Sequence, residues 1–219
     1  MQEKLYSPLL HERIRMKNRV IIVGGGAAGM LASVFAAKKG CEVTLFEKNE
    51  KLGKKLYITG KGRCNVTNNC DPEELLNSVV TNAKFLYSAF YTFTSQDMMD
   101  FLEEAGTALK TERGNRVFPC SDRSSDIIRA LERQMKKYGV QIRLKSQVQK
   151  LLVEEGKVTG ISLTDGSVHR AEGVIVATGG LSYPTTGSTG DGYRFAREAG
   201  HTVTDLSPSL VPLLSLIHI

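Results

Sequence analysis

The residue spacing with the clearest chemical meaning lies near the start of the chain. Gly24, Gly26 and Gly29 have the G-x-G-x-x-G spacing directly after the apolar run Val20 to Val23, and Glu47 follows the last glycine by 18 residues. Such glycines allow a tight turn, a close approach of the backbone to a pyrophosphate and close packing of a helix on a strand. The helix N-terminus attracts phosphate, and the distal acid can accept hydrogen bonds from ribose hydroxyls. The segment predicts a dinucleotide site; the alternative is a purely structural glycine turn.

A parallel sheet is needed to position this motif. The apolar runs at 19–24 and 42–47 are predicted to be buried strands, with a helix over 27–39 between them. Residues 140–144 are predicted to form a third parallel strand, and residues 174–177 a further buried strand. Because ligands bind at the carboxyl edge of such sheets, the glycine turn after this last strand is expected beside the ligand.

Three short runs separate the third strand from the last one. They cover residues 147–154, 157–164 and 167–170, and the turn signals Glu155-Gly156 and Asp165-Gly166 join them. Short runs joined by tight turns predict an antiparallel β-meander, where a continuing α/β repeat would have a helix.

The stretch between the second and third strands is long. Its first part, residues 48–69, is rich in glycine and lysine and is predicted to be a functional loop. The remaining predictions are a helix opened by Asp71-Pro72, a helix over 85–93 packed on the domain, a helix capped by Ser95, a hairpin turning at Gly114-Asn115, a helix from Ser121 or Asp122 to Tyr138, and a helix over 190–199 after the last strand.

Composition excludes several other classes of protein. The chain has 219 residues, of which 41% are hydrophobic, and a net charge of +6. No run approaches the roughly 18 apolar residues of a membrane helix. Cys41, Cys64, Cys70 and Cys120 form no C-x-x-C pair, so we expect reduced thiols, no metal site and a cytoplasmic location. The basic stretch Lys48 to Arg63 lacks aromatic residues at base-stacking spacing, which argues against a nucleic-acid partner.

Three features favour FAD over NAD as the dinucleotide: the loop that continues through Lys48, Gly53 and Lys54, the β-meander, and the glycine turn Ala177 to Gly180. Three longer motifs then resemble a known family. The stretch Thr59 to Asn68 reads TGKGRCNVTN, residues 177–201 read ATGGLSYPTTGSTGDGYRFAREAGH, and residues 208–213 read PSLVPL. Together they resemble bacterial FAD-dependent oxidoreductases of the BaiN-like and aminoacetone oxidase-like kind, within the glutathione-reductase-type FAD fold. The resemblance covers residues 17–213. It implies an α/β fold: a Rossmann-like FAD-binding domain with a parallel sheet and an inserted three-stranded β-meander, truncated at its C-terminus.

The resemblance also implies roles for individual residues around FAD. The implied contacts are Gly24, Gly26, Ala27, Ala28 and Gly29 at the pyrophosphate; Glu47 and Lys48 at the adenosine; Lys54, Gly60, Arg63, Cys64 and Asn65 toward the flavin; Val148 at the adenine through its backbone; Thr178, Gly179 and Gly180 beside the cofactor; and Ser182, Gly187, Gly190 and Asp191 near the isoalloxazine.

Some of these residues have an alternative interpretation. Arg63 could meet the pyrophosphate or a reduced flavin, or could be a solvated loop charge. Cys64 could be a redox thiol, although a small packing residue in a tight turn is the preferred interpretation. Asn68 is expected to bond loop backbone. Asp191 could contact the ribityl chain or cap a helix.

The sequence thus predicts an FAD-dependent oxidoreductase with a small-molecule substrate, and NAD(P)H is the candidate electron donor; no catalytic side chain is identified. The alternatives are a non-catalytic dinucleotide-binding fragment and an FAD-dependent RNA-modifying enzyme. The expected organisation is a disordered extension over 1–16, an incomplete FAD-binding domain over 17–207, and over 208–219 the start of a missing substrate domain with an artefactual tail, LSLIHI.

Overall fold

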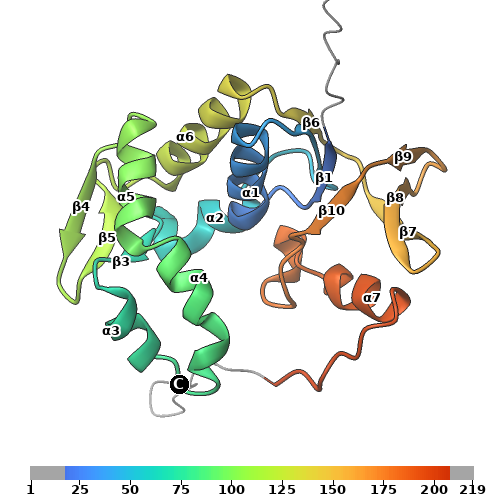
Figure 1. Ribbon diagram of the computed structural model, residues 1–219. Coiled ribbons are helices and arrows are strands. Elements are labelled where there is room, and N and C mark those ends of the chain that lie inside the picture. Colours follow the sequence, from blue (N-terminus) through green and yellow to red (C-terminus); the bar gives the residue numbers. More distant parts are fainter. Residues whose placement is uncertain (1–17, 208–219) are drawn as a thin grey trace, which may run out of the picture.

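A four-stranded parallel sheet lies at the centre of the molecule, as seen in the computed structural model, which describes residues 18–207 (Figure 1). Its strands are β1 (Arg19–Val23), β2 (Glu42–Phe46), β6 (Gln141–Arg143) and β10 (Gly173–Val176), in the order β10-β1-β2-β6. Every neighbouring pair is parallel. The predicted α/β sheet and its four strands are therefore confirmed.

Side chains of the two central strands alternate between two cores. Ile22 and Leu45 pack on one face of the sheet, in the larger apolar cluster. Ile21, Val23 and Phe46 pack on the opposite face in a second cluster. Because both faces of a parallel sheet are buried, strands of this kind read as continuous apolar runs, and each face needs a covering layer.

Helices cover the first face. They are α1 (Ala27–Lys38), α5 (Ser95–Glu104) and α6 (Ser124–Lys137), which Figure 1 shows together on one side of the sheet. Ile127, Leu131 and Met135 recur on α6 at helical spacing, and all three are buried. Helix α6 therefore has the amphipathic pattern of a helix with one face in the core.

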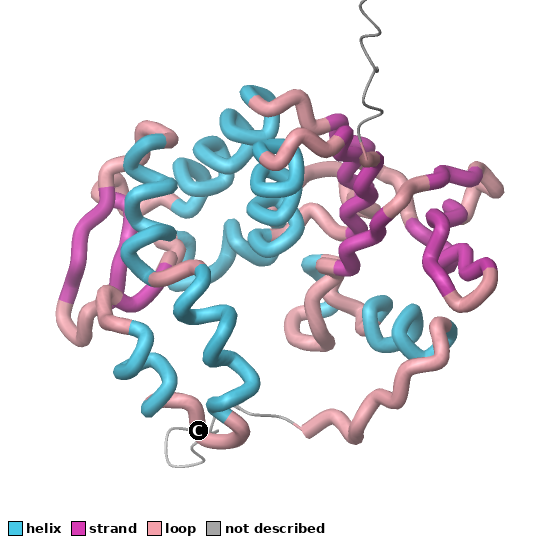
Figure 2. The backbone as a smooth tube through the Cα atoms, in the orientation of Figure 1, coloured by secondary structure: helices cyan, strands magenta, loops and turns pink. Residues whose placement is uncertain are grey.

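The second face is covered by the meander and the last helix. The antiparallel strands β7 (Val148–Glu154), β8 (Lys157–Leu163) and β9 (Val168–Arg170) pair in chain order, which confirms the predicted meander. Phe195 of α7 (Asp191–Glu198) is buried in the same apolar cluster as Val148 and Ile161. Figure 2 shows this meander on the side of the molecule opposite the small hairpin sheet described next.

The chain segment between β2 and β6 contains helices and a small sheet. A three-stranded sheet has the order β3-β5-β4, and its hairpin turns at Gly114 and Asn115 as predicted, both with left-handed backbone angles. The bounds are α2 (Lys54–Ile58), the 3-10 helix η1 (Thr59–Gly62), β3 (Thr67–Asn68), α3 (Pro72–Asn77), the 3-10 helix η2 (Ala83–Leu86), α4 (Tyr87–Thr92), β4 (Leu109–Glu112) and β5 (Arg116–Pro119); η3 (Pro184–Thr186) precedes α7.

Two local predictions differ from the structure. The predicted loop at 48–69 contains α2 and η1, because Leu52 is buried in the larger core and Leu56 packs against that core. The cap of α5 is Thr94 rather than Ser95: the Thr94 hydroxyl accepts from the Asp97 N–H at 3.1 Å, and the Asp97 carboxylate accepts from the Thr94 N–H at 2.7 Å. This reciprocal capping box satisfies two helix-end donors, and Ser95 lies inside the first turn.

Two other helices differ in extent. The helix predicted from Ser121 or Asp122 begins at Ser124, because Asp122 has a left-handed φ of 56°. The segment predicted as one helix over 85–93 is split between η2 and α4, neither of which has a buried residue. The predictions for 1–16 and 208–219 lie outside the described residues. Within residues 18–207, no helix has the length and apolarity needed to cross a membrane.

Candidate functional site

A cavity of about 320 Å³ lies at the carboxyl ends of β1, β2 and β10. Since β2 and β10 flank β1 on opposite sides, the cavity is at the point where the strand order reverses, which is where ligands bind in open α/β sheets. It is lined by Val23 to Ala28, Phe46 to Asn49, Lys51, Lys54 to Leu56, Thr59, Ser146 to Val148, Ala177 to Gly179, Thr186 to Ser188, Asp191 and Phe195.

The three predicted glycines have different steric roles. A Cβ on Gly24, where φ is +107°, would lie 2.5 Å from the Ala177 carbonyl oxygen. A Cβ on Gly29 would lie 1.8 Å from the Gly24 carbonyl oxygen, so this glycine sets the close approach of α1 to the turn. A Cβ on Gly26 would have no neighbour within 4 Å, and Gly26 lines the cavity. Only at Gly26 does the missing side chain leave room for a ligand.

Gly25 is a fourth required glycine, and the spacing pattern does not identify it. A Cβ there would lie 2.4 Å from Leu52 Cδ2 and 3.1 Å from the Glu47 carboxylate. The only sequence signal for this role is the unbroken run of three glycines.

The N-terminus of α1 faces the cavity without a partner of its own. No side chain caps this twelve-residue helix, and its first turn contains no acidic residue. The cap residue Gly26 and the first helical residues, Ala27 and Ala28, line the cavity. Uncapped N–H groups and the positive end of the helix dipole together favour a bound anion such as a phosphate.

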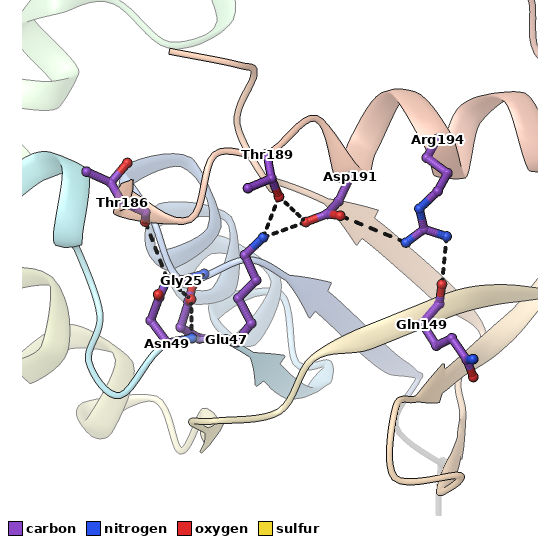
Figure 3. Close-up of polar contacts among 9 residues, drawn as sticks. Gly25, Glu47, Asn49, Gln149, Thr186, Thr189, Asp191 and Arg194 are labelled. Atoms are coloured by element: carbon purple, nitrogen blue, oxygen red, sulfur yellow. Dashed lines mark hydrogen bonds and ion pairs between the residues drawn. The ribbon is translucent and has the colours of Figure 1, made fainter. Parts of the chain in front are cut away.

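Glu47 anchors the turn and retains some acceptor capacity. Its Oε2 accepts from the Gly25 N–H at 2.6 Å, and its Oε1 accepts from the Asn49 backbone N–H at 2.8 Å and from Asn49 Nδ2 at 2.6 Å (Figure 3). A carboxylate has about four acceptor positions, so about one is left for a ligand hydroxyl. The side chain is only 7% exposed and lines the cavity. Its predicted ribose contact is compatible with this geometry and stays a prediction.

Two polar bridges join the β2 end of the cavity to the segment before α7. Lys48 Nζ donates to Asp191 Oδ2 at 2.6 Å and to Thr189 Oγ1 at 2.7 Å. Asn49 Nδ2 donates to the Thr186 carbonyl at 3.3 Å, an arrangement visible in Figure 3. Burial opposes ionisation of Asp191, but the hydrogen bonds from Lys48 and Thr189 outweigh it, so the pKa of Asp191 lies below its usual value. The charged pair closes one side of the cavity.

An unpartnered hydroxyl lies in the turn after β10. Thr178 lines the cavity, and its buried Oγ1 has no hydrogen-bond partner among the described residues. The neighbouring Gly179, with φ of +73°, keeps space for Ser188, whose Oγ would lie 2.8 Å from an added Cβ. The hydroxyl packs toward α7, where a Cβ added on Gly192 would lie 2.9 Å from it. A buried hydroxyl without a partner is costly, and this one lies against the last helix, although other atoms of Thr178 line the cavity.

Most of the residues predicted toward the flavin lie outside the cavity lining. Arg63 forms ion pairs with Glu112 and Asp122, and its guanidinium carbon lies 4.2 Å from the centroid of the Phe118 ring. These contacts fasten η1 to the β4–β5 hairpin, so Arg63 is neither a free loop charge nor a lining residue of the cavity. Its contact with the pyrophosphate or flavin stays a prediction.

Cys64 and Asn65 lie in the same contact region between η1 and the small sheet. Cys64 is 1% exposed, and burial raises the pKa of its thiol, which favours the packing interpretation over a reactive thiolate. The Asn65 amide faces the carbonyl oxygens of Thr67 and Val117, within the small sheet. Asn68 donates to the Gly114 carbonyl at 3.0 Å, a loop-backbone bond of the predicted kind.

The structure thus divides the predicted site residues into two sets. Those that line the cavity are Gly24, Gly26, Ala27, Ala28, Glu47, Lys48, Lys54, Val148, Thr178, Gly179 and Asp191, with Gly187. Those outside the lining are Gly29, Gly60, Arg63, Cys64, Asn65 and Gly180, with Ser182 and Gly190. Gly25, Asn49, Ser146, Gln147 and Ser188 also line the cavity, and the sequence analysis assigned none of them a role there. In the described part of the chain, no group of three or more His, Cys, Asp or Glu side chains could hold a metal.

The fold and the cavity define a dinucleotide-binding α/β protein, and comparison with known proteins specifies the family. Residues 18–211 match the HI0933-like protein Rossmann domain, so the chain belongs to this family of FAD-dependent oxidoreductases. It is 33% identical over 199 residues to the 3-dehydro-bile acid delta(4,6)-reductase of Clostridium scindens. It is also 33% identical over 195 residues to the ribosomal RNA dihydrouridine synthase of Haemophilus influenzae.

The match covers most of this chain but only part of each relative. It covers 90% of the chain and 47% of the Clostridium protein, and 88% of the chain and 48% of the Haemophilus protein. The chain therefore spans about half the length of these relatives. The fold also matches a flavocytochrome c3 fumarate reductase with a TM-score of 0.62 and 27% identity, over 84% of this chain and 40% of that one.

One prediction about partners is not supported by the comparisons. The sequence argued against nucleic acid, yet one of these relatives is a ribosomal RNA dihydrouridine synthase. The names of these relatives include both a small-molecule substrate and an RNA substrate.

Proposed function

We propose that this chain holds the adenosine-diphosphate half of FAD in a flavin-dependent reductase. The observation that carries the proposal is the open position at Gly26, where an added Cβ would have no neighbour within 4 Å beside an uncapped helix N-terminus. Glu47, which has about one acceptor position left, lines the same cavity and supports a ligand that carries hydroxyl groups. The residues present fit the dinucleotide that the family uses.

Each part of the cavity has a role in this proposal. The first N–H groups of α1 would bind the pyrophosphate, and Glu47 would accept a hydrogen bond from a ribose hydroxyl. Lys48 and Asp191 would close the cavity beside the bound nucleotide. When bound, FAD supplies hydride transfer, and the protein contributes binding, orientation and electrostatics. NAD(P)H as the electron donor is part of the same proposal.

Calorimetric titration of the chain with FAD, ADP and riboflavin tests the assignment. We expect FAD and ADP to bind with similar affinity and riboflavin to bind far more weakly, because the cavity fits the adenosine end. The variant Glu47→Gln should weaken ADP binding roughly 10- to 100-fold, since hydrogen bonds to charged groups contribute about 1.5–3 kcal/mol. Glu42→Gln, at the opposite end of β2, is the matched control and should bind normally.

Two results would contradict the proposal. One is the absence of FAD and ADP binding up to about 1 mM, the weak limit of specific affinity. The other is an equal loss of affinity in both glutamate variants. If the chain binds ADP and FAD but the FAD-loaded chain oxidises neither NADH nor NADPH, the non-catalytic alternative is favoured instead.

In a second candidate function, the substrate of the reaction is RNA, as the name of the Haemophilus relative indicates for that protein. One observation favours it over a small-molecule substrate. Residues 48–63 contain six Lys or Arg residues and one acidic residue, a net charge of +5 against +6 for the whole chain. The other 203 residues together carry only +1. Such a concentration of positive charge beside the cavity is the electrostatic footprint of a polyanion site.

A further inference from the structure

The cations of residues 48–63 fall into two groups. Three of them are neutralised within the protein: Lys48 by Asp191, Lys54 by Glu50, and Arg63 by Glu112 and Asp122. Lys51, Lys55 and Lys61 form no ion pair with any described residue. Their charges are therefore available to a ligand.

These three lysines lie on one continuous structural unit. Lys51 comes just before α2, Lys55 is in α2, and Lys61 is in η1, which contacts α2. Lys51 and Lys55 also line the cavity, whereas Lys61 lies outside its lining. The positive surface therefore begins at the cavity and continues away from it.

An exposed aromatic ring lies beside one of these charges. Tyr57 is 53% exposed, and Lys51 Nζ lies 5.3 Å from the centroid of its ring. Ile58, beside it in α2, is 45% exposed. An exposed tyrosine next to cations is the combination on which single-stranded nucleic acids stack their bases while their phosphates are neutralised.

The backbone that carries Tyr57 is attached to the core of the protein. Ser124 Oγ of α6 donates to the Tyr57 carbonyl oxygen at 2.8 Å. Leu52 is buried in the larger core, and Gly53 packs so closely on Ile128 that an added Cβ would lie 2.9 Å from its Cγ1. The exposure of Tyr57 thus comes from a fixed backbone.

We propose that Lys51, Lys55, Lys61 and Tyr57 form a docking surface for a single-stranded segment of RNA beside the cavity. This inference rests on the second candidate function and names its substrate surface. A chain of phosphates matches several cations spread along a helix and the following turn, whereas a single nucleotide offers charge at one end only. The aromatic ring adds a contact that a simple anion would not use.

Fluorescence anisotropy with a labelled oligouridine of about 12 nucleotides tests the surface on the complete chain. The test variant replaces all three lysines by glutamine: Lys51→Gln, Lys55→Gln and Lys61→Gln. The matched control removes the same charge from exposed, unpaired lysines elsewhere: Lys136→Gln, Lys150→Gln and Lys157→Gln.

We expect the test variant to bind RNA at least about ten-fold more weakly, and the control to change less than about two-fold. The slope of log affinity against log salt should fall by about 2 in the test variant, because each phosphate contact on a single strand contributes about 0.7. Tyr57→Ala should weaken binding about five-fold or more, and Tyr57→Phe should restore it, since the phenyl ring still stacks.

Three results would overturn the proposal. The first is no RNA binding at low salt, and the second is an equal loss in the two triple variants. The third is complete displacement of RNA by saturating FAD or NADPH, which would assign the lysines to a cofactor. The ADP titration tests the dinucleotide proposal separately. If the chain binds RNA but not ADP, only the dinucleotide proposal is refuted. If the chain binds ADP but not RNA, only the docking surface is refuted.

Discussion

Two alanine substitutions within the glycine motif are expected to have different effects: Gly26→Ala should weaken nucleotide binding, and Gly29→Ala should lower the stability of the fold. Gly26 has φ of −80° and ψ of −172°, angles that alanine adopts, and an added Cβ would meet no atom within 4 Å. Replacing glycine by alanine at compatible angles stabilises a protein by about 0.4–1 kcal/mol, because it lowers the conformational entropy of the unfolded chain. Alanine is, however, a poorer helix cap than glycine by a similar free energy. Gly26→Ala should therefore change the free energy of unfolding by less than about 0.5 kcal/mol.

Gly29→Ala should behave in the opposite way. Its Cβ would lie 1.8 Å from the Gly24 carbonyl oxygen, so the helix and the turn must separate by more than an ångström. Overpacking of this kind costs about 3 kcal/mol or more, and helix propensity returns about 1 kcal/mol. The expected net loss is about 2 kcal/mol, which lowers Tm by roughly 4–8 °C for a domain of this size.

The effect on nucleotide binding distinguishes the two variants further. In Gly26→Ala the methyl group points into the space assigned to the pyrophosphate, and a steric cost of about 1–3 kcal/mol weakens binding roughly 5- to 140-fold. Urea denaturation gives the stability of each variant, and calorimetric titration with ADP gives its affinity. The reasoning is refuted if Gly26→Ala binds ADP like the parent chain, or if both variants lose the same stability.

Three further outcomes are expected. Thr94→Ala should lower the free energy of unfolding by about 1 kcal/mol in urea denaturation by removing the cap of α5, and Thr94→Ser should not; equal losses would argue against the cap. A thiol reagent should label exposed Cys120 before buried Cys64, whose pKa burial raises; mass spectrometry that finds Cys64 labelled first in the folded protein would contradict this. Hydrogen bonds from Arg19 lower the pKa of Glu172 to about 2, so its contribution to stability is complete above about pH 4.5 and is lost as pH falls toward 2; an NMR titration midpoint near 4.5 would exclude the pairing.

Local patterns predicted the elements of this protein well. The strands of the central sheet, the meander and the β4–β5 hairpin are confirmed, because apolar runs and glycine turns act over a few residues. The cap of α5 was misplaced by one residue, since threonine and serine are both good caps and only the bond to Asp97 decides between them. The helix α2 was missed because its five residues show no period and only contact with the core stabilises it.

The sequence by itself determined the motif at one end of the cavity. Gly24, Gly26, Gly29 and Glu47 lie within one strand-helix-strand unit, so their spacing along the chain already specifies their roles. Family motifs added FAD as the dinucleotide.

Only the tertiary structure decided what faces this motif. Lys48 meets Asp191, 143 residues away, because β10 returns beside β1 and brings α7 to the same edge of the sheet. Arg63 pairs with Glu112 and Asp122, which lie 49 and 59 residues away along the chain, whereas Lys51, Lys55 and Lys61 form no ion pair with any described residue. The ion-pair partner of a charged residue cannot be predicted from the sequence, because such pairs form between segments that meet only after folding.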